Sequence, residues 1–271
     1  MNTIPRSEHP KPQFQRDKWM NLNGQWAFEI DNGRSGKARG LYQADAQLSG
    51  QILVPFCPQS ELSGVNHKDF LSGVWYRRTF ELTKEQLSGR VALHFGAVDY
   101  RCEAFVNGVS VGTHTGGYVS FCFDVTEAVR EGENVITVYA EDDERDPLIP
   151  RGKQSELFYS HGCDYTRTTG IWQTVWLEPV ASSHITSIKA IPNIDNGVMS
   201  VTVGACSDSP VSDIVEVSLL DKGQVVATAK GVQGTELRLA VQNPTLWEPS
   251  NPYLYDMKVS LSKNGKKVDE V

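Results

Sequence analysis

The chain has 271 residues, of which 39% are hydrophobic and 22% charged, so it has room for one large or two ordinary globular domains and is too apolar for a disordered chain. Its net charge of −7 argues against nucleic acid as a partner, because nucleic-acid binders usually present a basic face. No run of about 18 apolar residues occurs, so the sequence predicts no membrane-spanning segment and no membrane partner.

Residues 1–18 are polar and lack the apolar core of a signal peptide. We therefore expect a cytoplasmic protein, or a periplasmic or secreted one if a signal peptide has been removed.

The six histidines show no His-x-x-x-His pairing, and no Cys-x-x-Cys occurs. The sequence predicts buried structural thiols, no metal and no cofactor in this chain; the five cysteines are Cys57, Cys102, Cys122, Cys163 and Cys206.

Strand patterns dominate the first two thirds of the chain. Apolar residues alternate with less apolar, solvent-facing ones over residues 90–95, which predicts a strand with one buried face. Asn107-Gly108 between two apolar runs is a strong hairpin signal, because both turn positions require positive φ. Residues 135–140 form an apolar run expected of a strand buried on both sides. Residues 171–177 predict another strand, with both of its tryptophans on one face.

A boundary is predicted near residues 179–184, where the spacing of the strands changes. Three long irregular insertions, at residues 31–49, 64–73 and 141–165, interrupt the strands before it. After it the strands are short and evenly spaced. We expect an all-β chain in two domains, a jelly-roll β-sandwich over residues 1–182 and an immunoglobulin-like β-sandwich over residues 183–271. The strands predicted for the second domain are residues 187–191, 199–205, 215–220, 225–229, 236–240 and 255–261, followed by a hairpin to residue 271.

Residues 108–112 match Gly-x-Ser-x-Gly, the pattern of a nucleophile elbow. The elbow requires a strand, a sharp turn and then a helix, whereas Ser110 follows a hairpin turn and lies in a strand pattern. We therefore expect no nucleophile here.

The third insertion begins with an acidic run, in which residues 141–146 include five carboxylates. The run is typical of a solvated loop, but it also fits a calcium site or a set of acceptors for sugar hydroxyls, because carboxylates form strong hydrogen bonds. Further along, residues 151–154 and 159–167 supply the Lys, Gln, His, Asp, Tyr and Arg side chains that a polyol site needs. The alternative is a loop held by its own hydrogen bonds or packed on another domain, and the residues leave this open.

Tryptophans offer stacking faces for sugar rings, but strand-like apolar surroundings favour burial in the core. We therefore expect core positions for the six tryptophans, which are Trp19, Trp26, Trp75, Trp172, Trp176 and Trp247.

Taken in order, short motifs along the whole chain resemble glycoside hydrolase family two, the family of β-galactosidases, β-glucuronidases and β-mannosidases. Each motif is weak alone, and their joint order carries the resemblance. The motifs lie at residues 19–28, 54–56, 61–64, 74–80, 95–100, 106–108, 111–112, 116–118, 123–126, 133–134 and 169–178 of the first domain, and at residues 246–249 and 251–255 of the second.

The resemblance implies a galactose-binding-like jelly roll, then an immunoglobulin-like domain, then a (β/α)₈ barrel with two catalytic glutamates. A barrel needs about 250 further residues of alternating strands and helices, a pattern that is absent here. Retaining hydrolysis needs two carboxyl groups about 5–5.5 Å apart, and no pair in this chain can be assigned to those roles. We expect no catalytic residue in this chain and no activity from it alone.

The resemblance also implies sugar contacts from loops of the first domain. In some β-galactosidases an acidic residue at the end of the strand after the Glu-Asn motif holds the outermost sugar, and Asp142 and Asp143 follow that strand here. Residues 151–154 are similar to a β-galactosidase-like branch, which favours galactosidase over glucuronidase. The expected substrate-binding residues are Asp142, Asp143, Lys153, Gln154, Asp164 and Arg167.

The leading hypothesis is the non-catalytic N-terminal part of a retaining exo-β-glycosidase that hydrolyses terminal β-galactosides in carbohydrate metabolism. Its expected partners are a β-linked sugar, its own barrel domain and, for a homo-oligomer, a second copy. The alternatives are a β-glucuronidase or β-mannosidase of the same family, a free-standing carbohydrate-binding module, and an adhesion or scaffold protein of paired sandwiches.

Overall fold

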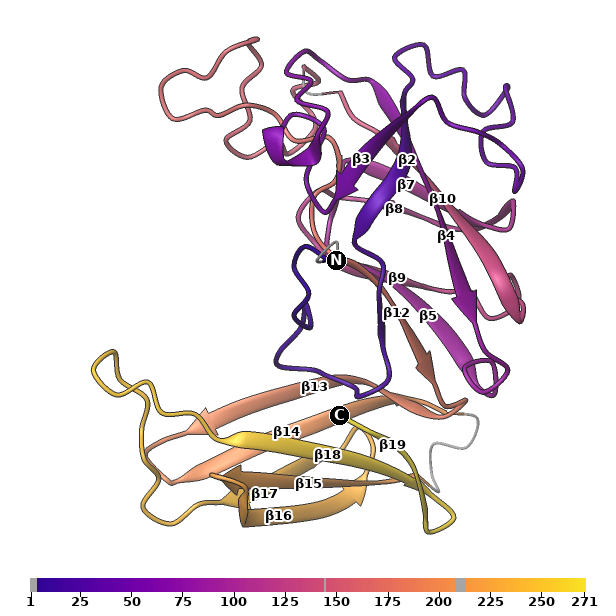
Figure 1. Ribbon diagram of the computed structural model, residues 1–271. Coiled ribbons are helices and arrows are strands. Elements are labelled where there is room, and N and C mark those ends of the chain that lie inside the picture. The colour runs from indigo at the N-terminus through magenta and orange to yellow at the C-terminus, as the bar shows by residue number, and fades with distance from the viewer. Residues whose placement is uncertain (1–3, 144, 208–212) are drawn as a thin grey trace. The chain divides into compact units, whose positions relative to one another are not determined.

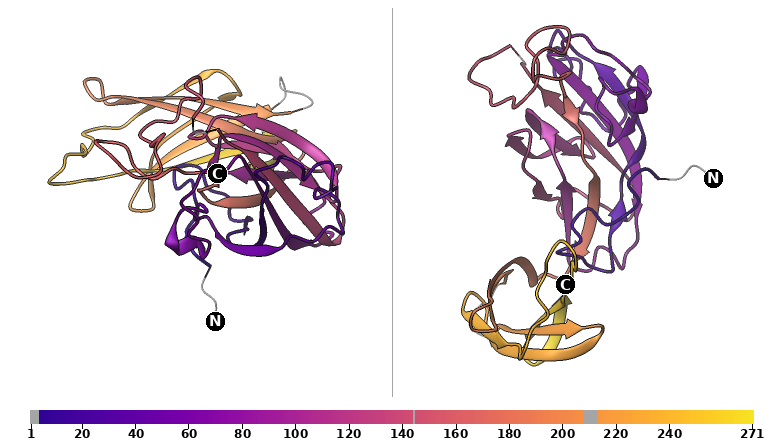
Figure 2. Two further views of the ribbon diagram at one scale, coloured as in Figure 1. Left: turned by 90° about the horizontal axis from the view of Figure 1, so that it is seen from above. Right: turned by 90° about the vertical axis from the view of Figure 1, so that its left-hand side faces the viewer.

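The computed structural model describes residues 4–143, 145–207 and 213–271, which form two compact units (Figure 1). The first domain combines Lys18–Pro179 with the described residues before Lys11. The second combines Lys11–Asp17 with the described part of Val180–Val271. The short segment at Lys11–Asp17 thus belongs with strands far along the chain, and Figure 2 shows the strands of each domain from two further sides.

Two antiparallel sheets enclose the core of the first domain, and apolar side chains of both contribute to one buried cluster. The smaller sheet has the order β1 (Met20–Asn21), β12 (Val175–Val180), β5 (Arg90–Phe95) and β9 (Phe121–Asp124). The larger has the order β3 (Gly50–Val54), β2 (Gly24–Ile30), β4 (Gly73–Leu82), β10 (Gly132–Glu141), β7 (Arg101–Val106) and β8 (Val109–Thr115). β6 (Val98–Asp99) pairs with β11 (Gly170–Ile171), and η1 (Glu61–Ser63) is a short 3₁₀ turn.

Several strand patterns are confirmed. β5 buries Val91, Leu93 and Phe95 and leaves the residues between them half-buried, as the alternation predicted. β10 is buried along residues 134–140, because both of its faces are covered: Ile136 and Val138 join the core cluster, and Tyr139 packs in a second cluster on the other face. The turn between β7 and β8 has positive φ at both Asn107 and Gly108, 52° and 83°.

One predicted strand is wrong. Residues 171–177 do not form a continuous strand, because the backbone leaves the ladder between β11 and β12. There the carbonyl of Thr174 accepts the N–H of Gly96 at 2.8 Å. The two tryptophans consequently differ: Trp176 is buried, whereas Trp172 is half-buried and donates its Nε1–H to the Gly117 carbonyl at 2.8 Å.

Two expectations about side-chain burial need correction. Trp26, Trp75 and Trp176 lie in the core, but Trp247 is 58% exposed, because it lies on a loop between strands and not in one. Cys102 is buried, whereas Cys122 and Cys163 are exposed, so burial does not hold for all of the thiols.

The second domain is a sandwich of two antiparallel sheets around its own apolar cluster. One sheet has the order β13 (His184–Asn193), β14 (Val198–Cys206) and β17 (Glu236–Ala240), and the other has β16 (Gln224–Val232), β15 (Asp213–Asp221), β18 (Asp256–Lys263) and β19 (Lys266–Glu270). Arg16 from the N-terminal segment pairs with Asp269 at 2.8 Å, and Phe14 packs against the cluster. These contacts hold the segment on this domain.

The fold is all-β, as the sequence predicts. In the part of the chain that the structure describes, no helix is long and apolar enough to cross a membrane.

Candidate functional site

The insertion between β10 and β11, residues 142–169, contains all six residues expected to bind substrate. It follows the strand labelled β10 in Figure 1. Its two arms run side by side: the N–H of Ser155 donates to the Tyr165 carbonyl at 2.8 Å, and the N–H of Tyr165 donates to the Lys153 carbonyl at 2.7 Å. Gln154 and Tyr165 thus form a parallel bridge, and the residues between them form a loop that closes on itself.

Arg167 anchors this loop from inside. Its side chain is 1% exposed, and its Nη atoms donate to the carbonyls of Ser155, Leu157 and Phe158 in the opposite arm. Nη2 also donates to the Lys68 carbonyl, outside the insertion. A guanidinium has five N–H donors in a rigid fork, so one arginine can hold several carbonyls in place. These contacts give Arg167 a structural role in holding the loop, and its expected contact with sugar stays a prediction.

A second anchor is a polar network around the buried Asp99, at the end of β6. Gln154 from the insertion donates Nε2–H to Asp99 Oδ2 at 2.7 Å and to the Tyr118 hydroxyl at 3.2 Å. Its Oε1 accepts the N–H of Thr168 at 2.6 Å, and the Tyr118 hydroxyl donates to the Arg151 carbonyl at 2.6 Å. Gln154 thus joins both arms of the loop to the sandwich.

Burial controls the ionisation of this network. Loss of hydration raises the pKa of Asp99 to about 6, and the hydrogen bond from Gln154 opposes this only in part. Burial also raises the pKa of Tyr118, and the negative charges of Asp99 and Asp142 add to that shift. At Gly117 a Cβ atom would lie 2.2 Å from Asp99 Oδ1, so the close approach of this turn requires glycine.

The expected site residues separate into two groups. Asp142, Gln154 and Arg167 are buried, whereas Asp143 and Lys153 are exposed and Asp164 is half-buried. Of the first three, Gln154 and Arg167 support the loop. The last three are at least partly exposed to solvent, where a ligand can reach them. Of the acidic run, Glu144 lies outside the described residues.

Sequence reasoning missed Asp99, Tyr118 and the apolar surface of the insertion. Both polar residues lie in motifs that resemble the family, but nothing in their spacing from Gln154 predicts the contact. Leu148 is 88% exposed, and large apolar or aromatic side chains at Phe158, Tyr159 and Tyr165 are more than half exposed. Exposed rings next to polar donors are a combination that suits a sugar face or a docking surface.

Comparison with known proteins identifies the family. Residues 19–178 match the sugar-binding domain of glycosyl hydrolases family 2, and residues 183–271 match a second domain described as glycosyl hydrolases family 2. The chain belongs to glycoside hydrolase family 2. The resemblance that the motifs predicted is confirmed.

Some relatives of this family 2 chain are called β-glucuronidase and others β-galactosidase. A putative β-glucuronidase of Formosa agariphila is 28% identical over 98% of the chain and 32% of its own length. A β-galactosidase of Thermoanaerobacter pseudethanolicus is 28% identical over 74% of the chain and 28% of its own length. The chain therefore spans about a third or less of these relatives.

Among solved structures, a β-glucuronidase of Ruminococcus gnavus has the same fold. The TM-score is 0.77 at 23% identity, and the match covers 95% of this chain and 44% of that protein. At this identity the likeness shows the fold and nothing of substrate choice.

Proposed function

We propose that the two domains are the non-catalytic N-terminal part of a retaining exo-β-glycosidase that removes terminal β-galactosyl residues. The observation that carries this proposal is the ordered match of two consecutive family 2 domains to a chain that spans only about a third of its named relatives. The two carboxyl groups of a retaining enzyme would then belong to a barrel domain that this chain does not include.

The insertion supports a role beside such a barrel. Its buried residues fix the loop on the first sandwich, and its outer surface exposes Leu148, Phe158 and Tyr159 together with the charged Asp143 and Lys153. The apolar part suits packing against another domain. The polar part suits hydrogen bonds to hydroxyl groups of the outermost sugar.

A β-glucuronidase is a second candidate, because relatives of that name match the chain as well as those called β-galactosidase. One from Paenibacillus borealis is 28% identical over 89% of the chain. A glucuronide carries a carboxylate, which favours cationic contacts, so Lys153 would suit either substrate. Whether the enzyme prefers a galactoside or a glucuronide is expected to depend mainly on the barrel.

Turnover tests the proposal directly. We would purify the 271-residue chain and the protein encoded by its complete reading frame, and assay both with aryl β-galactoside and aryl β-glucuronide. The complete protein is expected to hydrolyse the galactoside faster, and the 271-residue chain to hydrolyse neither. Turnover by the shorter chain would contradict the proposal, and a complete protein that prefers the glucuronide would assign the substrate to the second candidate.

Titration of the 271-residue chain with galactose and glucuronic acid separates the proposal from a free-standing carbohydrate-binding module. A module would bind with a dissociation constant of about 1 mM or tighter, which corresponds to about 4 kcal/mol. We expect no measurable heat, because a surface that only completes a sugar site supplies a few of the contacts.

A further inference from the structure

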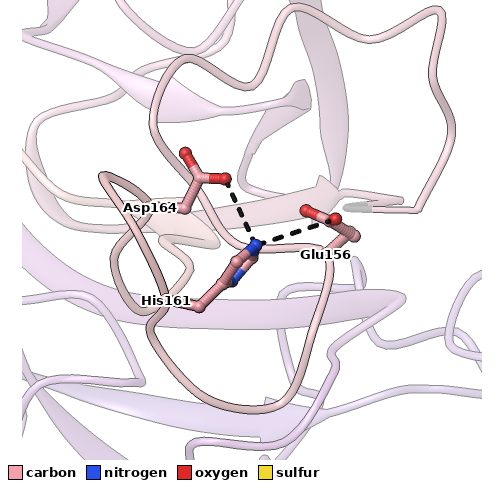
Figure 3. Close-up of side chains that lie close together, drawn as sticks. All are labelled: Glu156, His161 and Asp164. Atoms are coloured by element: carbon pink, nitrogen blue, oxygen red, sulfur yellow. Dashed lines mark ion pairs between the residues drawn. The ribbon is translucent and has the colours of Figure 1, made fainter.

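Three side chains with metal-ligating atoms meet at the tip of the insertion (Figure 3). The Nε2 atom of His161 lies 3.8 Å from Asp164 Oδ2 and 4.0 Å from Glu156 Oε1. All three ligand atoms lie within 4.8 Å of one another. The side chains are 27–40% exposed, so the group is open to solvent on one side and supported by the loop on the other.

Backbone hydrogen bonds in the loop bring His161 and Asp164 together. The N–H of His161 donates to the Asp164 carbonyl at 3.1 Å, and the N–H of Asp164 donates back to the His161 carbonyl at 2.8 Å. This reciprocal pair fixes the two residues across a tight turn in which Gly162 has a φ of 53°. Glu156 comes from the opposite arm, directly after the buried Ser155. The group therefore joins both arms of the insertion.

The hydroxyl of Ser155 fixes the orientation and tautomer of the His161 ring. Ser155 Oγ donates its proton to the Tyr159 carbonyl at 2.8 Å and accepts the N–H of Leu157 at 3.1 Å. Because its one proton is used, its 3.1 Å contact with His161 Nδ1 must be donated by the ring. A neutral His161 then presents the lone pair of Nε2 to the two carboxylates. A second hydrogen bond of this kind is what metal-ligating histidines usually have.

A positive charge between the Nε2 lone pair and the two carboxylates would stabilise this arrangement. A proton on Nε2 would supply one, but both distances exceed the roughly 3.2 Å limit of an N–H···O hydrogen bond. Ligands of a tetrahedral Zn²⁺ ion are about 3.4 Å apart, given metal–ligand distances near 2.1 Å. The two distances from His161 Nε2, 3.8 and 4.0 Å, are slightly wider than this, and all three ligand atoms lie within 4.8 Å of one another, so the partly exposed side chains would have to draw together around an ion. Arg151 contacts the other oxygen of Glu156, Oε2, at 3.0 Å.

We propose that Glu156, His161 and Asp164 form a binding site for a divalent first-row metal ion, with Zn²⁺ as the best fit. One imidazole and two carboxylates are ligands that Zn²⁺ accepts in proteins. Three protein ligands leave a coordination position that water or an oxygen atom of a ligand can take. The ion would cross-link the two arms of the insertion next to the exposed Phe158 and Tyr159. This site is independent of the proposed glycosidase function.

Zn²⁺ titration of the reduced 271-residue chain, followed by calorimetry, tests the site. The wild-type chain is expected to bind one ion at the site, and His161→Gln to weaken binding at least tenfold. His67→Gln is the matched control, because His67 is half-buried in a separate loop and should leave binding unchanged. Glu156→Gln and Asp164→Asn should each weaken binding. Ser155→Ala should weaken it by about tenfold through loss of the ring's support.

Cobalt(II) gives a second readout that does not depend on activity. Visible absorption of bound Co²⁺ should appear with the wild-type chain and with Cys163→Ser, and disappear with His161→Gln. Circular dichroism of His161→Gln should match the wild type, because the side chain is partly exposed. Equal Zn²⁺ affinity in wild type and His161→Gln, or no bound ion in the wild type, would overturn the proposal and leave the three residues as an ion-pair group.

Discussion

The strand framework of the first domain and the insertion that interrupts it are stabilised by different interactions. In the framework the buried side chains are mainly apolar, and the backbone groups pair along the ladders. In the insertion the buried side chains are polar, as at Gln154, Ser155 and Arg167, and the large apolar ones such as Leu148 are exposed. Among its described residues the insertion therefore has no buried apolar side chain, and it depends on hydrogen bonds to keep its shape.

This difference has a consequence for local stability. Framework strands share one apolar cluster, so they should unfold together at the full free energy of the domain. A loop that depends on a few buried polar contacts can open while the framework stays folded. Three substitutions and one matched control compare the two regions, from the largest expected effect to the smallest.

Trp26→Ala is expected to cause the largest loss of unfolding free energy. Trp26 is buried in β2, packs edge-on against Tyr76 and donates its Nε1–H to the Leu22 carbonyl at 2.8 Å. Removing so large a buried ring typically costs about 3–5 kcal/mol of unfolding free energy. Denaturant unfolding followed by fluorescence and circular dichroism should show the whole first domain destabilised. A loss below about 1 kcal/mol would show that this position does not belong to a cooperative core.

Arg167→Ala is expected to act on the insertion alone. The change leaves buried carbonyls without their donor, at a cost of about 3 kcal/mol in the local opening free energy. Limited proteolysis under native conditions should then cleave within residues 145–166, while the unfolding midpoint of the framework changes little.

Arg145→Ala is the matched control for that substitution. Both guanidinium groups lie over the Phe70 ring, Arg145 at 3.7 Å and Arg167 at 4.3 Å from its centroid, but Arg145 is exposed. Its removal should leave the cleavage rate close to that of the wild type. If both substitutions speed cleavage equally, the ring contact holds the loop and the buried carbonyl contacts do not.

Asp99→Asn should change the pH dependence of stability by about 3 kcal/mol. The pKa of Asp99 is about 6 in the folded chain, above its ordinary value of 3.8, so the folded state binds this proton more tightly than the unfolded state does. The stability of the wild type should fall as the pH rises from about 4 to 6, and Asp99→Asn should lack this component.

Chemical denaturation of both chains at a series of pH values measures that difference. Because other groups titrate equally in the two proteins, only the gap between the curves reports Asp99. Parallel curves would mean that Asp99 is not desolvated and that the Gln154 anchor is insensitive to pH.

The sequence by itself determined the fold class, the family and most strands, because apolar alternation and turn residues are local signals. β10, the Asn107-Gly108 turn and the evenly spaced strands of the second domain follow from neighbours along the chain. Where the backbone contacts residues far away, local reasoning failed: the pattern at residues 171–177 indicated one strand, and contacts to Gly96 and Asn23 divide it.

Only the tertiary structure decided which polar residues of the insertion are supports and which face solvent. Asp142 and Asp143 are neighbours in sequence, yet one is buried and the other exposed. The contact of Gln154 with Asp99 spans 55 residues, and the convergence of Glu156 with His161 depends on a loop that doubles back. Polar side chains follow no simple periodicity, because each is placed by a specific hydrogen-bond partner, and that partner is defined only when the chain has folded.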